Sequence, residues 1–277
     1  MHIFKSRFLR RGEVWFDQEP DQSLVDWIYY RQRPSRVPGA KWNYFHTILI
    51  DLINPAEALF QSCNKSTRYK IRRGRDVDKF ICQNVTPITQ DTLNRFAEIY
   101  KTFAAQRGLG SLDGSRLEQL AKEGYLELSV VKNHEGTSLV HHIYYRGPNR
   151  SCLLHSVSSH KAMEDSLARS AAARANCLLT WCDILRHKEQ GLKHFDFGGW
   201  YPGTTDRTRL DINRFKEGFG GKVVREYNCE QILTLKGRVF LTLGSLMERR
   251  NAERRKPQTR ANRTQCAAVS DPIVAAN

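Results

Sequence analysis

The stretch from His194 to Gly221, HFDFGGWYPGTTDRTRLDINRFKEGFGG, decides how the rest of the sequence is interpreted. It opens with a short strand in which Phe195 and Phe197 alternate with Asp196, so the carboxylate lies on the opposite face from the two rings. Two glycines follow directly, and glycine lets the backbone approach a ligand closely. An acid at the end of a strand, followed by glycines, is typical of ligand sites in open α/β sheets.

The end of the same stretch places a lysine between two aromatic side chains. Phe215 and Phe219 are four residues apart on one helical face, and they flank Lys216. Anchored in this way, the ammonium group is expected to project into a cleft. On these residues alone a second interpretation stays open, in which Asp196 makes a structural hydrogen bond and Lys216 lies on the surface.

The composition is that of a globular protein with an excess of positive charge. Of the 277 residues, 40% are hydrophobic and 26% are charged, and the formal net charge is +15. Such a charge attracts polyanions: nucleic acid, an anionic membrane face or phosphorylated small molecules. No run of eighteen apolar residues occurs, and the N-terminus lacks the apolar core of a signal peptide, so we expect a cytoplasmic protein.

The cysteines and histidines point away from a metal site. The seven cysteines are odd in number and form no CxxC pair, which suits reduced thiols. Adjacent strand residues His141 and His142 point to opposite faces and cannot hold one metal together. His142 or His155 could act as a general base, but each is more often a packed or exposed strand residue.

The order of elements predicts a layered α/β fold around a mixed sheet. The expected strands are Glu13–Asp17, Val25–Tyr30, Tyr44–Leu52, Lys79–Val85, Tyr125–Lys132, Ser138–Arg146, Cys152–Ser158, Lys193–Phe197 and Lys222–Tyr227. The expected helices are 55–76, 89–107, 113–123, 171–191 and 210–218. We predict three parts: a β-rich segment 1–52 that packs on or completes the lobe, a catalytic domain 53–247, and a basic, disordered tail 248–277.

Two positive features suggest contacts with anions. A helix that follows a three-stranded meander offers free amides at its start, and Arg169 and Arg174 are expected just before or within its first turn. On an earlier helix, Lys65, Arg68 and Arg72 share one face with Arg75. Either a phosphate or nucleic-acid contact or a solvated charged face explains this second pattern.

Three segments, in this order, resemble the Fem-type (FemAB-like) branch of the GNAT acyltransferase superfamily. KSTRYKIRRGR at Lys65–Arg75 is similar to the pattern S/T-x-R-x-x-I-R-K/R, and RANCLLTWCDILRHKEQG at Arg174–Gly191 to N-x-x-L-x-W-x-x-I followed by glycine. FDFGGW at Phe195–Trp200 and RFKEGFGGKVVREY at Arg214–Tyr227 are close to the ending DFGG…FKxGFGG. The resemblance implies a GNAT-like α/β (α+β) fold, with a mixed, mostly antiparallel central sheet flanked by helices.

The resemblance also implies a chemistry and a set of site residues. In this branch an amine attacks an activated acyl carbonyl, and the enzyme mainly positions the reactants and stabilises the oxyanion. Lys216 is expected to be catalytic, and Asp196 is added by geometry as a group that orients the amine or takes its proton. Contacts to the acyl donor are assigned to Arg169, Arg174, Asn176 and Phe215, and contacts to the acceptor to Lys65, Arg68, Arg72, Trp200 and Tyr201. No metal is expected.

The sequence leaves several functions open. The first is N-acyl transfer from acyl-CoA, in particular acetyl-CoA, to an amine of a phosphorylated cell-envelope or polysaccharide precursor, which is an anionic small molecule or a lipid-linked sugar. The second is a Fem-type transfer from aminoacyl-tRNA; the short chain favours the first and the net charge the second. A nucleic-acid-binding module without catalysis and a degenerate lobe acting as a scaffold are the remaining alternatives. The basic segments also suggest peripheral contact with an anionic membrane.

Overall fold

The computed structural model describes residues 1–6, 8–158 and 165–240. The predicted tail 248–277, together with residues 241–247 of the predicted catalytic domain, lies outside the described residues.

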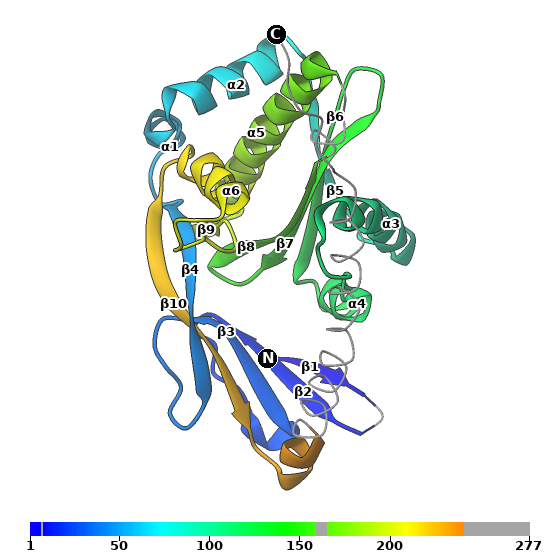
Figure 1. Ribbon diagram of the computed structural model, residues 1–277, viewed down its shortest axis with the longest axis vertical. Helices are drawn as coiled ribbons and strands as arrows, with labels where there is room; N and C mark the ends of the chain where they lie inside the picture. Colours follow the sequence, from blue (N-terminus) through cyan, green and yellow to red (C-terminus); the bar gives the residue numbers. More distant parts are fainter. Residues whose placement is uncertain (7, 159–164, 241–277) are drawn as a thin grey trace, which may run out of the picture.

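One ten-stranded sheet runs through the described residues in the order β1-β2-β3-β10-β4-β9-β8-β7-β6-β5 (Figure 1). Neighbouring strands are antiparallel except for the pairs β2–β3 and β8–β9. The strands are β1 His2–Lys5, β2 Arg10–Trp15, β3 Trp27–Arg33, β4 Lys41–Asp51, β5 Ile81–Val85, β6 Leu126–Lys132, β7 Ser138–Arg146, β8 Arg150–Ser158, β9 His194–Asp196 and β10 Lys222–Ile232. The mixed, mostly antiparallel sheet predicted from the sequence is confirmed.

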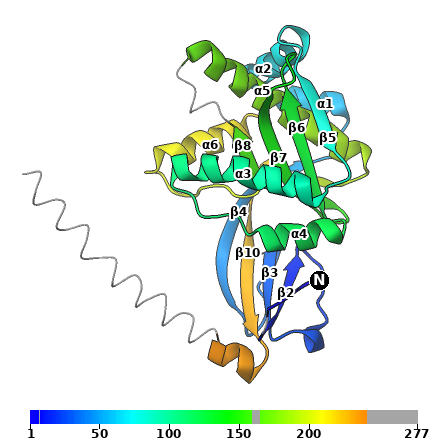
Figure 2. The same cartoon turned by 90° about the vertical axis from the view of Figure 1, so that its right-hand side faces the viewer.

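Helices cover both faces of the sheet (Figures 1 and 2). The helices α2, α5 and α6 lie on one face, and α3 and α4 on the other. Their bounds are α1 Ala56–Ser62, α2 Lys65–Asp76, α3 Gln90–Arg107, α4 Gly114–Lys122, α5 Ser166–Glu189 and α6 Arg207–Glu217. Adjacent residues of β7 alternate between the two hydrophobic cores, with Tyr144 packed under α5 and Tyr145 on the α3 side.

The ends of α3 follow the sequence closely. The hydroxyl of Thr89 accepts a hydrogen bond from the amide of Thr92, and Gly108 ends the helix in the left-handed conformation at φ 61°. A hydroxyl before the first turn and a glycine after the last are the strongest local signals for helix ends. The predicted bounds of this helix are therefore confirmed.

The single helix predicted over 55–76 is wrong. The chain leaves the helix at Cys63, and Asn64 starts a new one by accepting a hydrogen bond from the amide of Thr67 at 2.8 Å. The amide of Asn64 itself donates to the carbonyl of Gly218, 2.9 Å away, at the end of α6. The break between α1 and α2 is therefore stabilised by a contact between residues distant in the sequence. The apolar periodicity of the helix carries no information about such a contact.

The start of α5 also differs from the prediction. The helix begins at Ser166 rather than at 171, because the carboxylate of Asp165 accepts hydrogen bonds from the amides of Leu167 and Ala168. Arg174 consequently lies in the third turn and not in the first, whereas Arg169 is in the first turn.

The last described strand is longer than predicted. The predicted end at Tyr227 is wrong, since β10 continues to Ile232 and pairs with β4 on one side and β3 on the other. This double pairing ties strands β1–β3 to the remainder of the sheet, so the first fifty residues continue the same sheet.

Candidate active site

The centre of the molecule is a fork between two parallel strands. Strands β8 and β9 pair over three residues only, Arg150–Cys152 with His194–Asp196. Strand β9 then ends, whereas β8 continues to Ser158 alongside β7. An irregularity in the β7–β8 register leaves Leu154 without a direct partner on β7, and such a bulge bends a strand locally. The two strands therefore diverge beyond Asp196.

Gly198 makes the fork possible. Its φ is +65°, and a Cβ atom placed there would lie 1.9 Å from the carbonyl oxygen of Leu153. No other residue could pass so close to β8 in this backbone conformation. This is the structural reason for the glycine directly after the strand that the sequence analysis singled out.

A cavity of about 260 Å³ lies beside the fork. Strand β8 forms one wall, and side chains from α2, α3, α5 and α6 line the others. Three of the predicted site residues, Asn176, Phe215 and Lys216, meet in this cavity. We call it the fork cavity.

Lys216 is held at the fork by a backbone contact and by its aromatic neighbours. Its Nζ donates a hydrogen bond to the carbonyl oxygen of Gly199. The rings of Phe215 and Phe219 pack edge to face, with centroids 5.4 Å apart, as their spacing predicted. Burial lowers the pKa of Lys216 to about 8, although the nearby charge of Asp196 opposes this shift. The expectation that the ammonium group reaches a cleft is met by this geometry.

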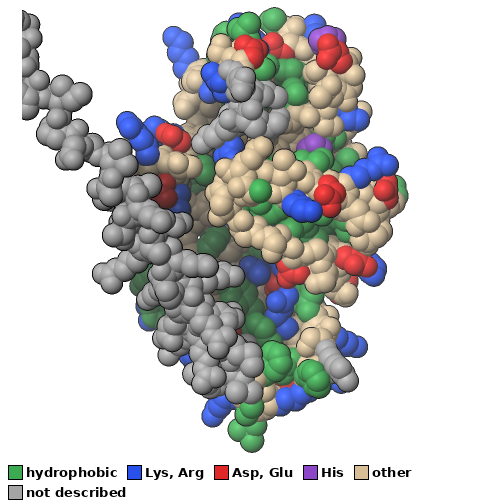
Figure 3. Space-filling model, turned by 45° about the vertical axis from the view of Figure 1, so that its right-hand side comes forward, with side chains coloured by type: hydrophobic (Ala, Val, Ile, Leu, Met, Phe, Trp, Pro, Cys, Tyr) green, Lys and Arg blue, Asp and Glu red, His purple; other side chains and the backbone are tan. Residues whose placement is uncertain are grey.

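The fork cavity is positive. Lys70 on α2 and Arg107 on α3 line it together with Lys216, against a single acid, Asp211, which pairs with Arg214. Within residues 1–6, 8–158 and 165–240, none of the three cations forms an ion pair. On the face shown in Figure 3, by contrast, basic and acidic side chains are interspersed. The cavity therefore brings together three cations that have no acidic partner among the described residues.

Asp196 lies beneath the fork and not at the cavity surface. It is fully buried, and Oδ2 accepts hydrogen bonds from Gln32 at 3.0 Å and from Arg150 at 2.5 Å and 3.0 Å. Its Oδ1 accepts from the hydroxyl of Thr47 and from the amide of Gly198. With both oxygens occupied in this way, the carboxylate is placed to anchor the fork.

The two arginines predicted near the start of α5 have different surroundings. The guanidinium of Arg174 pairs with Asp78, with Nη2 3.0 Å from Oδ1. Arg169 is exposed in the first turn, two turns before Asn176. The first amides of α5 are already bonded to Asp165, so the free helix start expected from the sequence is not present.

The predicted acceptor contacts do not line the fork cavity. Arg68 donates to the carbonyls of Gln61 and Cys63 at the end of α1, and the guanidinium of Arg72 lies over the ring of Phe60 at 5.2 Å. Lys65 is exposed in the first turn of α2. The basic residue of this helix that does reach the cavity is Lys70, which the one-face pattern left out.

Trp200 and Tyr201 lie in the loop between β9 and α6. The indole of Trp200 donates to Glu217 at 2.8 Å, and the guanidinium of Arg209 lies over the ring of Tyr201 at 5.3 Å. Neither residue is in the lining of the fork cavity. Both side chains are partly exposed, and in the sequence they follow Gly199, whose carbonyl accepts the hydrogen bond from Lys216.

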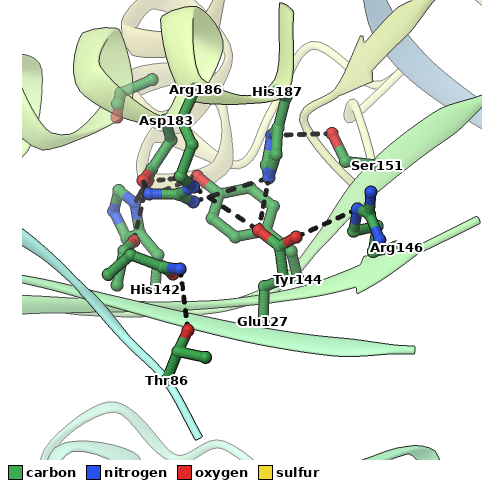
Figure 4. Close-up of polar contacts among 12 residues, drawn as sticks. Thr86, Glu127, His142, Tyr144, Arg146, Ser151, Asp183, Arg186 and His187 are labelled. Carbon is green, nitrogen blue, oxygen red and sulfur yellow. Dashed lines mark hydrogen bonds and ion pairs between the residues drawn. The ribbon is translucent and has the colours of Figure 1, made fainter. Parts of the chain in front are cut away.

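A polar network under α5 was missed by sequence reasoning (Figure 4). Asp183, fully buried on α5, accepts hydrogen bonds from His142 at 2.8 Å and from Tyr144 at 2.8 Å on β7. His142 also lines the fork cavity, where its Nε2 is 3.0 Å from Asn176. The available signal was an acid in the apolar part of a long helix, opposite a strand that carries histidine and tyrosine.

Comparison with known proteins identifies the fold. No protein-family model matches the chain, and no curated protein matches it in sequence. Among solved structures, FemX superposes with a TM-score of 0.54 at 15% identity, over 72% of this chain and 63% of FemX, less than two thirds of that protein. The chain has the fold of FemX. The mixed sheet and its flanking helices agree with the expectation drawn from the motifs.

Two further structures match over more of their own length. The C-terminal domain of a putative lysylphosphatidylglycerol synthetase from Agrobacterium fabrum has a TM-score of 0.50 at 12% identity, over 88% of this chain and 84% of that domain. L-PGS from Bacillus licheniformis has a TM-score of 0.51 at 14% identity, over 87% and 83%. At such identities the likeness establishes the Fem-type fold and not a shared substrate.

No helix within 1–6, 8–158 and 165–240 has the length and apolar character needed to cross a membrane. The same residues contain no group of three or more His, Cys, Asp or Glu side chains arranged to hold a metal ion.

Proposed function

We propose that this chain is an N-acyltransferase that moves an acyl group, in particular acetyl, from coenzyme A to an amine of a phosphorylated cell-envelope or polysaccharide precursor. The observation that carries the proposal is the position of Lys216, which reaches the fork between β8 and β9 in a cavity lined by two further cations. The Fem-type fold supports an acyl transfer as the reaction class.

In the proposed reaction the neutral amine attacks the thioester carbonyl carbon. A C–N bond forms, the carbonyl oxygen becomes negative, and the C–S bond then breaks as the proton lost by the amine passes to solvent and the thiolate leaves. With a pKa of about 8, Lys216 is mostly an ammonium at pH 7 and can stabilise the oxyanion. The edge of β8 that β9 leaves uncovered beyond Cys152 offers backbone amides for the same purpose.

The other residues of the fork cavity suit a phosphorylated donor. Lys70 and Arg107 are placed to bind phosphate oxygens, and Phe215 supplies an apolar wall. Arg169, exposed at the start of α5, is a further candidate for a phosphate outside the cavity. Asp196 is proposed to act indirectly: its charge favours the ammonium form of Lys216, and it does not contact the amine.

A second candidate donor is aminoacyl-tRNA. One matched structure is a domain of a putative lysylphosphatidylglycerol synthetase and another is L-PGS, and over 80% of each is covered. The net charge of +15 also favours a polyanionic donor. In that case the same cavity would hold the aminoacyl end of the tRNA, and a lipid or lipid-linked group would be the acceptor.

A thermal-shift screen of acetyl-CoA, longer acyl-CoAs and aminoacyl-tRNA separates these donors, because a ligand that binds only the folded state raises Tm. Amine-dependent release of free thiol from the best acyl-CoA then tests catalysis in wild type and Lys216→Ala. Lys188→Ala is the control, since Lys188 also donates to a backbone carbonyl, that of Leu52, away from the cavity.

We expect Lys216→Ala to lose at least a hundredfold in rate, in keeping with the loss of an oxyanion-stabilising group, while Lys188→Ala keeps the wild-type rate. If no acyl-CoA raises Tm at millimolar concentration and aminoacyl-tRNA does, the acyl-CoA proposal is overturned in favour of the second donor. Salt-sensitive RNA binding that persists in Lys216→Ala, without transfer of any acyl group, would identify a nucleic-acid-binding module instead.

A further inference from the structure

Both ring nitrogens of His142, in the wall of the fork cavity, take part in hydrogen bonds. Its Nδ1 is 2.8 Å from Oδ2 of Asp183, and its Nε2 is 3.0 Å from Oδ1 of Asn176. The ring is 1% exposed, whereas Asn176 is partly exposed and lines the cavity. A continuous path of hydrogen bonds therefore leads from a buried carboxylate through an imidazole to an amide at the cavity surface.

Asp183 is held as a carboxylate. Its Oδ2 also accepts from Tyr144 at 2.8 Å and from Ser129 at 3.0 Å, and its Oδ1 is 2.8 Å from the guanidinium of Arg186 (Figure 4). Burial by itself would raise the pKa of Asp183, but the hydrogen bond from His142 and the charge of Arg186 lower it below its usual value. An ionised carboxylate only accepts, so Nδ1 of His142 carries a hydrogen in either charge state of the ring.

The remaining nitrogen of His142 then determines the orientation of the Asn176 amide. When the ring is an imidazolium, Nε2–H donates to Oδ1 of Asn176 and leaves the NH₂ group to face the cavity. When the ring is neutral, Nε2 can only accept, so the amide must turn by about 180° and present its oxygen to the cavity. The cavity thus offers a donor in one charge state and an acceptor in the other.

We propose that His142 is a positioning residue that keeps the Asn176 amide turned with its NH₂ group toward the cavity, where it holds an oxygen of the acyl donor. This inference rests on the proposed function, because it names the same cavity as the donor site. The oxygen is a carbonyl or phosphate oxygen, which accepts hydrogen bonds only and matches the cations already present. The amide presents its NH₂ group to that oxygen only while Nε2 donates to Oδ1, so the 3.0 Å contact between these two atoms is what the proposal requires.

Charged and polar groups from several elements surround His142. Asp183 on α5 is in direct contact with Nδ1, and Arg186 pairs with the other oxygen of that carboxylate. Tyr144 on β7 shares the carboxylate, with its hydroxyl 3.1 Å from Nδ1, and His141 is adjacent on the opposite face. The charged residues that share the fork cavity with His142 are Lys70, Arg107, Asp211 and Lys216. The variants and the control must therefore retain Lys216 and the other three charged residues.

The first test is calorimetric binding of acetyl-CoA to wild type and variants at one pH. Asn176→Ala and His142→Gln, which both keep Lys216, are expected to bind acetyl-CoA about fivefold to tenfold more weakly than wild type, the worth of one good hydrogen bond. The matched control is His155→Gln, a partly buried histidine of β8 that contacts Phe96 and Tyr100 rather than the cavity, and it should keep the wild-type affinity.

The second test does not depend on the donor. Nitrogen NMR of the histidine rings, assigned with His142→Gln, must show a hydrogen on Nδ1 of His142, and Asn176→Ala must change the signal of Nε2. An Nδ1 without a hydrogen overturns the proposal, as does an unchanged affinity for acetyl-CoA in Asn176→Ala. If acetyl-CoA does not bind, the proposed donor is wrong, and the NMR result alone then decides the role of His142.

Discussion

Replacing Lys216 by methionine should raise the stability of the protein while it removes the proposed activity. The pKa of Lys216 is about 8 in the folded protein against an ordinary value of 10.5, so the fold disfavours the charged form. This lowering of the pKa of Lys216 corresponds to about 3 kcal/mol at pH 7. Because the side chain is only half-buried, solvent screening reduces this to about 2 kcal/mol. Methionine fills a similar volume without a charge, so this cost disappears.

The sign of the pH dependence follows from the direction of the shift. Between pH 8 and 10.5 the unfolded chain binds more protons at this position than the folded protein does, so wild-type stability rises with pH there. The advantage of Lys216→Met is therefore largest at or below pH 7, and it should narrow by about 1 kcal/mol by pH 9.5. Taking the difference between variant and wild type removes the effect of every other titrating group.

Urea unfolding at pH 7 and pH 9.5 measures this directly, through the midpoint concentration at constant slope. The control is Lys188→Met, which makes the same exchange at an ammonium that donates to the carbonyl of Leu52, outside the fork cavity. If Lys216→Met is less stable than wild type at pH 7, or if its advantage does not change with pH, the reasoning about the buried ammonium is refuted. Such a gain in stability with loss of function is common where a site holds a strained group.

Two further substitutions test the fork and its cavity. Lys70→Ala should weaken acetyl-CoA binding about threefold to tenfold and reduce the salt dependence of that binding. The control Lys101→Ala, at an exposed residue of α3 that pairs with Glu98, should change neither property. If calorimetry at two salt concentrations shows the same effect for both variants, Lys70 does not contact a phosphate. Gly198→Ala should lower the free energy of unfolding by about 3 kcal/mol or more. The control Gly136→Ala, also at positive φ but with no atom within 4 Å of the added Cβ, should lower it by about 1 kcal/mol. If urea unfolding gives similar losses for the two variants, the close approach of Gly198 to β8 is unimportant.

Local signals in the sequence determined the elements and their order. Thr89 and Gly108 fixed the ends of α3, because a capping hydroxyl and a left-handed glycine act within one turn. Likewise, alternation in the strands predicted that Phe195 and Phe197 would face one core and Asp196 the other side. The spacing of Phe215 and Phe219 around Lys216 favoured a cleft over the surface position that stayed open, and in the structure the ammonium group donates to the carbonyl of Gly199.

Tertiary structure alone decided which side chains meet. Lys70 reaches the fork cavity although Lys65, Arg68 and Arg72 made the more regular pattern, because the rotation of α2 is set by its packing on α5 and not by its charges. The same holds for His142, Asn176 and Asp183, whose partners come from a strand and a helix distant in the sequence. Periodicity reports the face of an element, whereas the partner of that face depends on how the whole sheet is ordered. The sequence therefore determined the fold and the lysine at its centre, and the packing determined the cavity in which that lysine lies.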